Sequence, residues 1–251
     1  MFVPRPQTEV LARRAVSLLP EDGIAVDLCT GSGAVAAVLA AARPRATLVA
    51  TDVDPVAVAC ARRNGVDALV GNLDEPLSPA LAGRVDVITA VVPYVSTEKL
   101  HLLPRDVLAN EPRLALDGGA RGTTVLERPA RAAARWLRPG GSVLLELGGD
   151  QASEVARTLA AVGLSEIRVH REPTGRTAQS KRDARARRRE VQPWLNAVIQ
   201  GLGIRVLHHK DLGRRGRGQS ASYTLQPSLC AAVALFGEVN PRLRLLRALP
   251  T

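Results

Sequence analysis

Short apolar runs alternate with amphipathic segments along residues 20–170 of the chain. The apolar runs predict strands, and the segments of roughly 10–15 residues between them predict helices. This alternation is typical of a parallel, doubly wound sheet, and strands that are apolar throughout are typical of a sheet covered on both faces. We therefore expect an α/β domain with strands at 24–28, 46–51, 67–70, 85–91, 142–147 and 165–170, and helices at 7–19, 33–42, 55–64, 122–137 and 150–162.

The charge of the chain is concentrated near its C-terminal end. Of the formal net charge of +10, residues 1–172 contribute −1 (19 Lys and Arg against 20 Asp and Glu), whereas residues 173–251 contribute +11 (15 against 4). The alternation of strands and helices also stops near residue 172, so we expect a domain over 1–176 and a basic extension over 177–251 that is partly helical or disordered. Because this extension has few aromatic residues for base stacking, we favour a solvated tail with at most weak nucleic-acid contact.

Several classes of protein do not fit the sequence. No apolar run approaches the roughly 20 residues of a membrane-spanning helix, and residues 1–6 lack the apolar core of a signal peptide. The histidines have no ligand partners at metal-binding spacing, and an odd number of widely spaced cysteines favours reduced thiols over disulfides or zinc. We expect a cytoplasmic protein without a metal site or membrane contact; its cysteines are Cys29, Cys60 and Cys230.

The most specific pattern follows the first expected strand, where residues 26–36 read VDLCTGSGAVA. Glycines in a turn between a strand and a helix let the backbone approach a nucleoside cofactor, and Asp52, at the end of the second strand, suits the ribose hydroxyls. Such a turn alone also fits NAD or FAD, or close packing without a ligand. Asp27, placed before the turn, favours S-adenosylmethionine, whose ammonium group an acid at this position can meet.

These residues resemble motif I of the HemK/PrmC-type protein N5-glutamine methyltransferases, which methylate peptide-chain release factors. The resemblance continues through further motifs and covers about residues 2–176. It includes FVPRPQTE at 2–9, DVDPVAV at 52–58, GNL at 71–73, EPRLAL at 111–116, RPGG at 138–141 and LE at 145–146. The family carries a helical substrate-docking domain before the first of these motifs, at which this chain starts, so we expect that domain to have been lost or left out of the assigned start.

The resemblance implies a Rossmann-like class I S-adenosylmethionine-dependent methyltransferase fold, S-adenosyl-L-methionine as cofactor and a release factor as protein substrate. The cofactor-binding residues that it implies are Asp27, Cys29, Thr30, Gly31, Gly33, Asp52, Val53, Asn72 and Leu73. The substrate-binding residues that it implies are Arg5, Pro6, Thr8 and Glu111, and the catalytic residues are Val91, Val92, Pro93 and Tyr94. At Cys29, we expect a small packing residue in place of the family's glycine rather than a nucleophile.

The chain departs from the family at the catalytic N-P-P-Y loop, where it reads Val91-Val92-Pro93-Tyr94. In the family, the Asn side-chain oxygen and a backbone carbonyl accept hydrogen bonds from the amide and aim its nitrogen at the sulfonium methyl. Valine has no acceptor, and loss of one such contact costs about 3–4 kcal/mol, or 10²–10³ in rate. The Val92 carbonyl remains as an acceptor. Thr89 lies one pleat back along the strand, so we do not expect its hydroxyl to replace the missing Asn oxygen. Tyr94 fits a catalytic role and a packing role equally.

Three functions therefore stay open. The first is an S-adenosylmethionine-dependent N-methyltransferase that acts on a glutamine of a protein such as a release factor. The second is a cofactor-binding homologue without turnover, which Val91 favours. The third is a nucleic-acid amino-group methyltransferase, because loops like N-P-P-Y also serve the planar amino groups of bases, and the basic extension could hold phosphates.

Overall fold

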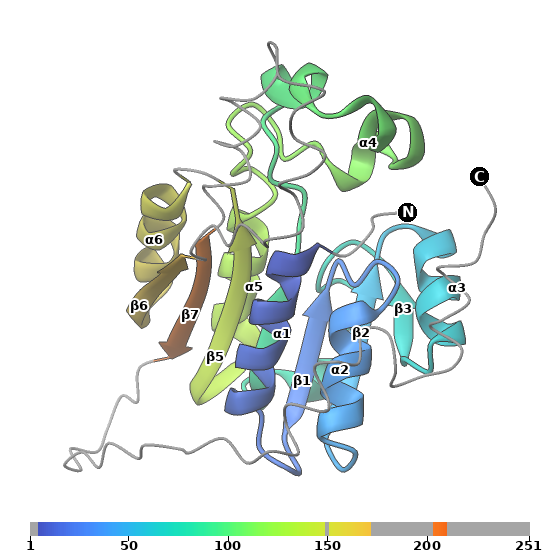
Figure 1. The fold of residues 1–251 in the computed structure, drawn as a ribbon. Coiled ribbons are helices and arrows are strands. Elements are labelled where there is room, and N and C mark those ends of the chain that lie inside the picture. The colour runs from blue at the N-terminus through green and yellow to red at the C-terminus, as the bar shows by residue number, and fades with distance from the viewer. Residues whose placement is uncertain (1–4, 149–150, 172–202, 210–251) are drawn as a thin grey trace, which may run out of the picture.

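A computed structural model describes residues 5–148, 151–171 and 203–209, and these residues form one seven-stranded sheet (Figure 1). The strand order is β3-β2-β1-β4-β5-β7-β6. Strands β1 to β5 run parallel, whereas β7 is antiparallel to both of its neighbours. The expected doubly wound, mostly parallel α/β fold is confirmed. The strands are β1 (Ile24–Leu28), β2 (Thr47–Asp52), β3 (Ala68–Val70), β4 (Val85–Ala90), β5 (Leu137–Leu147), β6 (Leu164–Arg171) and β7 (Gly203–His209).

Helices cover both faces of this sheet because successive residues of its central strands point to opposite sides. Ala25 of β1 and Val87 of β4 pack with α1 and α2, and α3 joins the same face through Ala50. The neighbouring Val26 and Ile88 pack with α5 and α6 on the other face. Figure 1 shows α1 and α2 in front of the strands and α5 behind them. The helices are α1 (Pro6–Leu18), α2 (Ala34–Ala42), α3 (Pro55–Arg63), α4 (Arg105–Asn110), α5 (Glu127–Trp136) and α6 (Ala152–Ala161).

Two expected boundaries were wrong by about five residues, and the others agree to within about two. The helix expected from residue 122 begins at Glu127, after a turn over residues 124–126; Gly122 itself has a φ of +72° and cannot be helical. Strand β5 begins at Leu137 rather than at residue 142, because Leu137 pairs with Val85 before the register shifts. Helix α4 and the 3₁₀ helices η2 (Thr97–Leu102) and η3 (Arg113–Ala115) were not expected; they lie in the excursion between β4 and α5.

Strand β7 lies within the range expected to be a helical or disordered extension, yet it pairs with β5 on one side and with β6 on the other. The sheet thus includes a strand beyond the expected domain boundary at residue 176. The remainder of 177–251 lies outside the described residues, including the charged run and Cys230, so the domain division stays a prediction. No helix in the described ranges is both long enough and apolar enough to cross a membrane.

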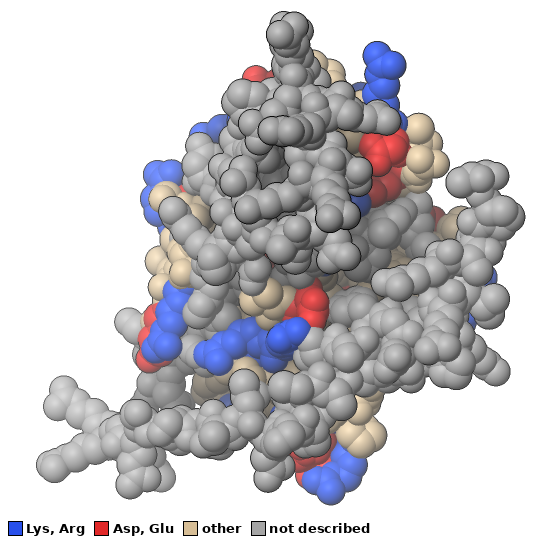
Figure 2. Space-filling view, in the orientation of Figure 1, with Lys and Arg blue, Asp and Glu red and all other residues tan. Residues whose placement is uncertain are grey.

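Basic and acidic side chains are mixed on the surface of the described part. Figure 2 shows Lys and Arg next to Asp and Glu on one face of the molecule. Ion pairs such as Arg45 with Asp22 (2.7 Å) and Arg131 with Glu127 (2.9 Å) are of this kind. This mixing agrees with the nearly balanced charge of residues 1–172.

Candidate functional site

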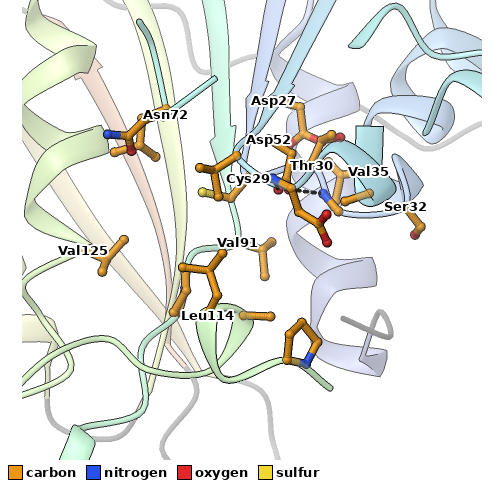
Figure 3. A pocket seen from close by; sticks show the side chains of 18 of the residues that line it. Asp27, Cys29, Thr30, Ser32, Val35, Asp52, Asn72, Val91, Leu114 and Val125 are labelled. Carbon is orange, nitrogen blue, oxygen red and sulfur yellow. Dashed lines mark hydrogen bonds between the residues drawn. The ribbon is translucent and has the colours of Figure 1, made fainter. Parts of the chain in front are cut away.

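A cavity of about 550 Å³ opens at the carboxyl ends of β1, β2, β3 and β4 (Figure 3). Ligands of open α/β sheets bind at this edge of the sheet. Polar groups from the ends of β1 and β2 gather in one part of the cavity, whereas apolar side chains line another part. The polar lining includes Asp27, Thr30, Ser32, Asp52, Asp54 and Asn72, and the apolar lining includes Val91, Pro93, Pro112, Leu114, Ala115 and Val125.

The glycine turn after β1 has the backbone that its sequence predicted. Gly31 and Gly33 have φ values of +56° and +81°, which residues with a side chain rarely adopt. A Cβ at Gly33 would lie 3.0 Å from the Cβ of Ala61, so this glycine lets the turn approach α3 closely. A Cβ at Gly31 would meet no atom within 4 Å, because this residue lines the cavity. The backbone is thus open to a ligand at Gly31, while Gly33 serves packing and does not line the cavity.

Asp52 connects the glycine turn to α3. Its carboxylate accepts hydrogen bonds from the backbone N–H groups of Gly31 (2.8 Å) and Asp54 (2.9 Å). Asp54 in turn caps α3 by accepting from the N–H of Val56 (2.8 Å). Because a carboxylate has about four acceptor positions, Asp52 keeps acceptors for the hydroxyl groups of a ligand.

Asp27 is a buried carboxyl group, with 2% of its surface exposed, at the edge of the cavity. The hydroxyls of Thr30 (2.7 Å) and Thr89 (2.6 Å) donate to it. Burial raises the pKa of Asp27 to about 6, although both hydrogen bonds oppose the rise. Thr89 thus binds Asp27 and does not itself line the cavity, and that it does not replace the acceptor missing at Val91 stays a prediction.

Cys29 lines the cavity, and its backbone is in the left-handed region with a φ of +56°. Its side chain packs against the core that includes residues of α5 and α6. Burial raises the pKa of its thiol to about 12, so the thiol stays protonated at neutral pH. A protonated thiol is a poor nucleophile, which favours the packing role over a catalytic one.

The remaining expected cofactor residues also line the cavity. Val53 is exposed and Leu73 is buried. Asn72 lines the cavity and donates a hydrogen bond to Glu75 (3.0 Å). Side chains from β1, β2 and the segment after β3 therefore surround one space, as their order along the chain implied. Their roles toward a ligand stay predictions.

The acceptor loop, which we define as residues 91–94, is only partly exposed to the cavity. Val91 and Pro93 line it, whereas Val92 is 2% exposed and belongs to the core. Tyr94 does not line it; the Tyr94 hydroxyl donates to Glu146 (3.2 Å). Burial and the adjacent Glu146 carboxyl raise the pKa of Tyr94, so this phenol is neutral.

Glu146, near the end of β5, was missed as a site residue, although the motif that contains it was noted. It is fully buried and also accepts from the hydroxyl of Thr8 (2.8 Å), which lines the cavity. Burial raises the pKa of Glu146, while both hydroxyl donors and the charge of Arg5 lower it. Glu146 thus joins α1 to the acceptor loop.

Of the other expected substrate-binding residues, Arg5 and Glu111 do not line the cavity. Arg5 and Glu111 form an ion pair with each other, in which the Glu111 side chain is 4% exposed. The side chain of Pro6 lies outside what the structure describes. Within the described residues, no group of three or more His, Cys, Asp or Glu could hold a metal ion.

The fold and the position of the cavity define a class I S-adenosylmethionine-dependent methyltransferase domain. Solved structures with this fold include an S-adenosylmethionine-dependent O-methyltransferase from Thermotoga maritima (TM-score 0.53, 15% identity, 86% of this chain and 69% of that one). Another is geranyl diphosphate C-methyltransferase from Streptomyces coelicolor (TM-score 0.53, 11% identity, 81% and 78%). At such low identity, these likenesses show the fold alone.

Sequence similarity identifies the family more closely. Residues 7–88 match the model of the Methyltransferase small domain. The release factor glutamine methyltransferase of Mycolicibacterium smegmatis is 41% identical over 152 residues (58% of this chain, 53% of that one), and that of Mycobacterium leprae is 36% identical over 199 residues (76% and 68%). The chain belongs to the release factor glutamine methyltransferase family. It spans between about half and two thirds of the length of these relatives.

Proposed function

We propose that this chain transfers a methyl group from S-adenosylmethionine to a glutamine side chain of a peptide-chain release factor in the cytoplasm. The observation that carries the proposal is a single cavity lined by Asp27, Gly31, Asp52 and also by Val91 and Pro93 of the acceptor loop. A cofactor held at the first group of residues would lie in the same space as an acceptor held at the second. Membership of the family supports the choice of glutamine.

The residues of the cavity fit S-adenosylmethionine. The Asp27 carboxylate suits the ammonium group of the cofactor, and the acceptors left on Asp52 suit the ribose hydroxyls. Asn72 suits the edge of the adenine, and the apolar Val53 and Leu73 suit its faces. The bound cofactor supplies an electrophilic methyl group on its sulfonium. The protein residues have to hold the acceptor nitrogen in line with that methyl and exclude water.

At the position of the family's Asn, the cavity offers no side-chain acceptor for an amide. The Val91 side chain has no hydrogen-bonding atom, and Leu114 and Val125 add further apolar surface, while Thr8 and Asp117 are polar residues of the same lining. The hydroxyls of Thr8 and Tyr94 both donate to Glu146. We propose that the Val92 carbonyl is the acceptor of the loop that remains to orient the amide. Transfer is expected to be slow, because one preorganised acceptor is missing.

A cofactor-binding homologue without turnover is the second candidate, favoured by Val91 and the apolar surface around it. A nucleic-acid acceptor has less support, because the basic segment on which it relies lies outside the described residues. Both candidates make predictions that differ from methyl transfer to a release factor, so a single set of assays separates the three.

The test measures labelled methyl transfer from S-adenosylmethionine to a purified release factor by the parent chain, Val91→Asn and Val91→Thr. The Asn variant restores an amide acceptor and should be faster than the parent by about 10²–10³. The Thr variant, which keeps the shape of valine, controls for polarity alone and should stay near the parent rate.

Calorimetric binding of S-adenosylmethionine without transfer by any of the three proteins would establish the second candidate instead. Equal rates for the parent and Val91→Asn would refute our account of the acceptor loop. Transfer to RNA but not to release factor would favour the nucleic-acid acceptor.

A further inference from the structure

One side chain connects the acceptor loop to two other loops without lining the cavity. Gln151, immediately before α6, donates from Nε2 to the backbone carbonyls of Tyr94 (2.7 Å) and Arg121 (3.3 Å). Its Oε1 accepts from the N–H of Gly148 (2.9 Å). Both amide hydrogens and the amide oxygen are therefore used, each by a different segment of the chain. These segments follow β4, precede α5 and follow β5.

Two glycines make room for this arrangement. A Cβ at Gly122 would lie 2.2 Å from the carbonyl oxygen of Tyr94 and 2.4 Å from Nε2 of Gln151. A Cβ at Gly148 would lie 2.9 Å from Cδ2 of the Tyr94 ring. Real Cβ atoms do not approach so closely, and here the obstacles include a backbone oxygen and a ring. The glycine-rich stretch before α5 is thus shaped to bring the Gln151 amide to Tyr94.

Tyr94 is held at both ends by the stretch from residue 146 to residue 151. Glu146 accepts from its hydroxyl and Gln151 donates to its carbonyl. The next residue, Val95, is fixed by bonds to Leu116 (3.1 Å) and Gly118 (2.8 Å). The acceptor loop therefore ends in a rigid anchor, whereas Val91 and Pro93 face the cavity.

We infer that Gln151 is a positioning residue that sets the conformation of the acceptor loop through the Tyr94 carbonyl. It does not line the cavity, so it acts on an acceptor only through residues 91–94. Its effect on the rate of methyl transfer rests on the proposed function; its effect on the loop does not. Loss of Gln151 is expected to lower kcat and leave the affinity for S-adenosylmethionine unchanged.

The experiment compares Gln151→Met, Gln151→Glu and the control Arg157→Ala, which changes an exposed residue of the same helix. The Met variant keeps the length of the side chain and removes all of its hydrogen bonds. The Glu variant keeps the acceptor for Gly148 but replaces the donor to Tyr94 with a carboxylate oxygen at neutral pH. If the anchor acts through Tyr94, both variants should behave alike; if it acts through Gly148, the Glu variant should resemble the parent.

The loop can be observed directly because the chain has only 2 tyrosines, Tyr94 and Tyr223. Protein labelled with 3-fluorotyrosine gives one ¹⁹F resonance for each, and Tyr223→Phe assigns them. We expect the Tyr94 resonance to shift or broaden in both Gln151 variants and to stay unchanged in Arg157→Ala. We expect kcat to fall about tenfold, which corresponds to about one net hydrogen bond, with the calorimetric Kd for S-adenosylmethionine within about twofold of the parent.

An unchanged Tyr94 resonance in Gln151→Met would overturn the inference, as would a Glu variant that matches the parent. If the Met variant does not fold, the Glu variant carries the same measurement. A parent chain that transfers no methyl would contradict the proposed function, and the ¹⁹F spectrum would still decide whether Gln151 anchors the loop.

Discussion

The affinity for S-adenosylmethionine should depend on pH through Asp27. Burial raises the pKa of this carboxyl from 3.8 to about 6, whereas an ammonium ligand requires the ionised form. The apparent Kd is then multiplied by 1 + 10^(pKa − pH), which is about 1.1 at pH 7 and about 11 at pH 5. We therefore expect affinity to weaken about tenfold between these two pH values.

The stability of the protein without cofactor should change in the opposite direction. A carboxyl whose pKa is higher in the folded than in the unfolded state destabilises the fold when ionised. That cost is fully present above pH 6 and is lost as the pH falls toward 3.8. Between pH 7 and pH 5, Asp27 alone should raise the free energy of unfolding by about 1 kcal/mol. The fold is thus more stable at the pH at which it binds the cofactor less well.

Calorimetry and urea unfolding at pH 7 and pH 5 measure both effects, with Asp27→Asn as the matched variant. Asn keeps hydrogen-bonding groups for Thr30 and Thr89 but cannot ionise. Its Kd should be at least about tenfold weaker at pH 7 and should not vary between the two pH values. A parent Kd that changes less than twofold, or an Asn variant that binds as tightly as the parent, would refute the role given to Asp27.

Two further predictions concern stability. Gly33 and Gly65 both have a φ of +81°, so Gly33→Ala and Gly65→Ala place an alanine in the same strained backbone conformation. Only at Gly33 does the new Cβ also meet Ala61, at 3.0 Å. In urea unfolding, each variant should lose about 1–3 kcal/mol of the free energy of unfolding, with the larger loss at Gly33, and equal losses would contradict the packing role of Gly33. Glu146→Leu should lower the free energy of unfolding by about 1–3 kcal/mol, because it leaves the hydroxyls of Thr8 and Tyr94 without an acceptor. Glu146→Gln should stay within about 1 kcal/mol of the parent, and an equal loss in both variants would show that these bonds are not responsible.

The fold could be predicted where residues close in sequence determine it, and less well where distant pairing does. Apolar runs and helical spacing were sufficient for β1 to β4 and for most helices. Residues 138–141 read as a Pro-Gly turn, and β5 begins before them only because Leu137 pairs with Val85 of β4. Strand β7 takes its place from β5 and β6 on either side, and nothing within residues 203–209 specifies those partners.

The same distinction separates the two halves of the site. Asp27, Gly31 and Asp52 belong to a local pattern of strand ends and a turn, so their spacing along the chain indicated that they line one cavity. Such a pattern does not reveal hydrogen bonds between residues that are distant along the chain. Gln151 and Tyr94 are 57 residues apart, and Thr8 and Glu146 are 138 residues apart. The ion pair between Arg5 and Glu111 was likewise not expected, and their roles toward a substrate stay predictions.

The surroundings of Val91 bear on whether its effect is local. If the contacts that support this loop had been lost together with its function, Tyr94 would be expected to lack its hydrogen bonds to both Glu146 and Gln151. Here both anchors are present, and the glycines that admit them leave no space for a side chain. On the proposed function, the lack of a side-chain acceptor at Val91 is then a change at one position in a loop whose backbone is held in place. This is why a single substitution, Val91→Asn, is expected to restore the rate without any second change.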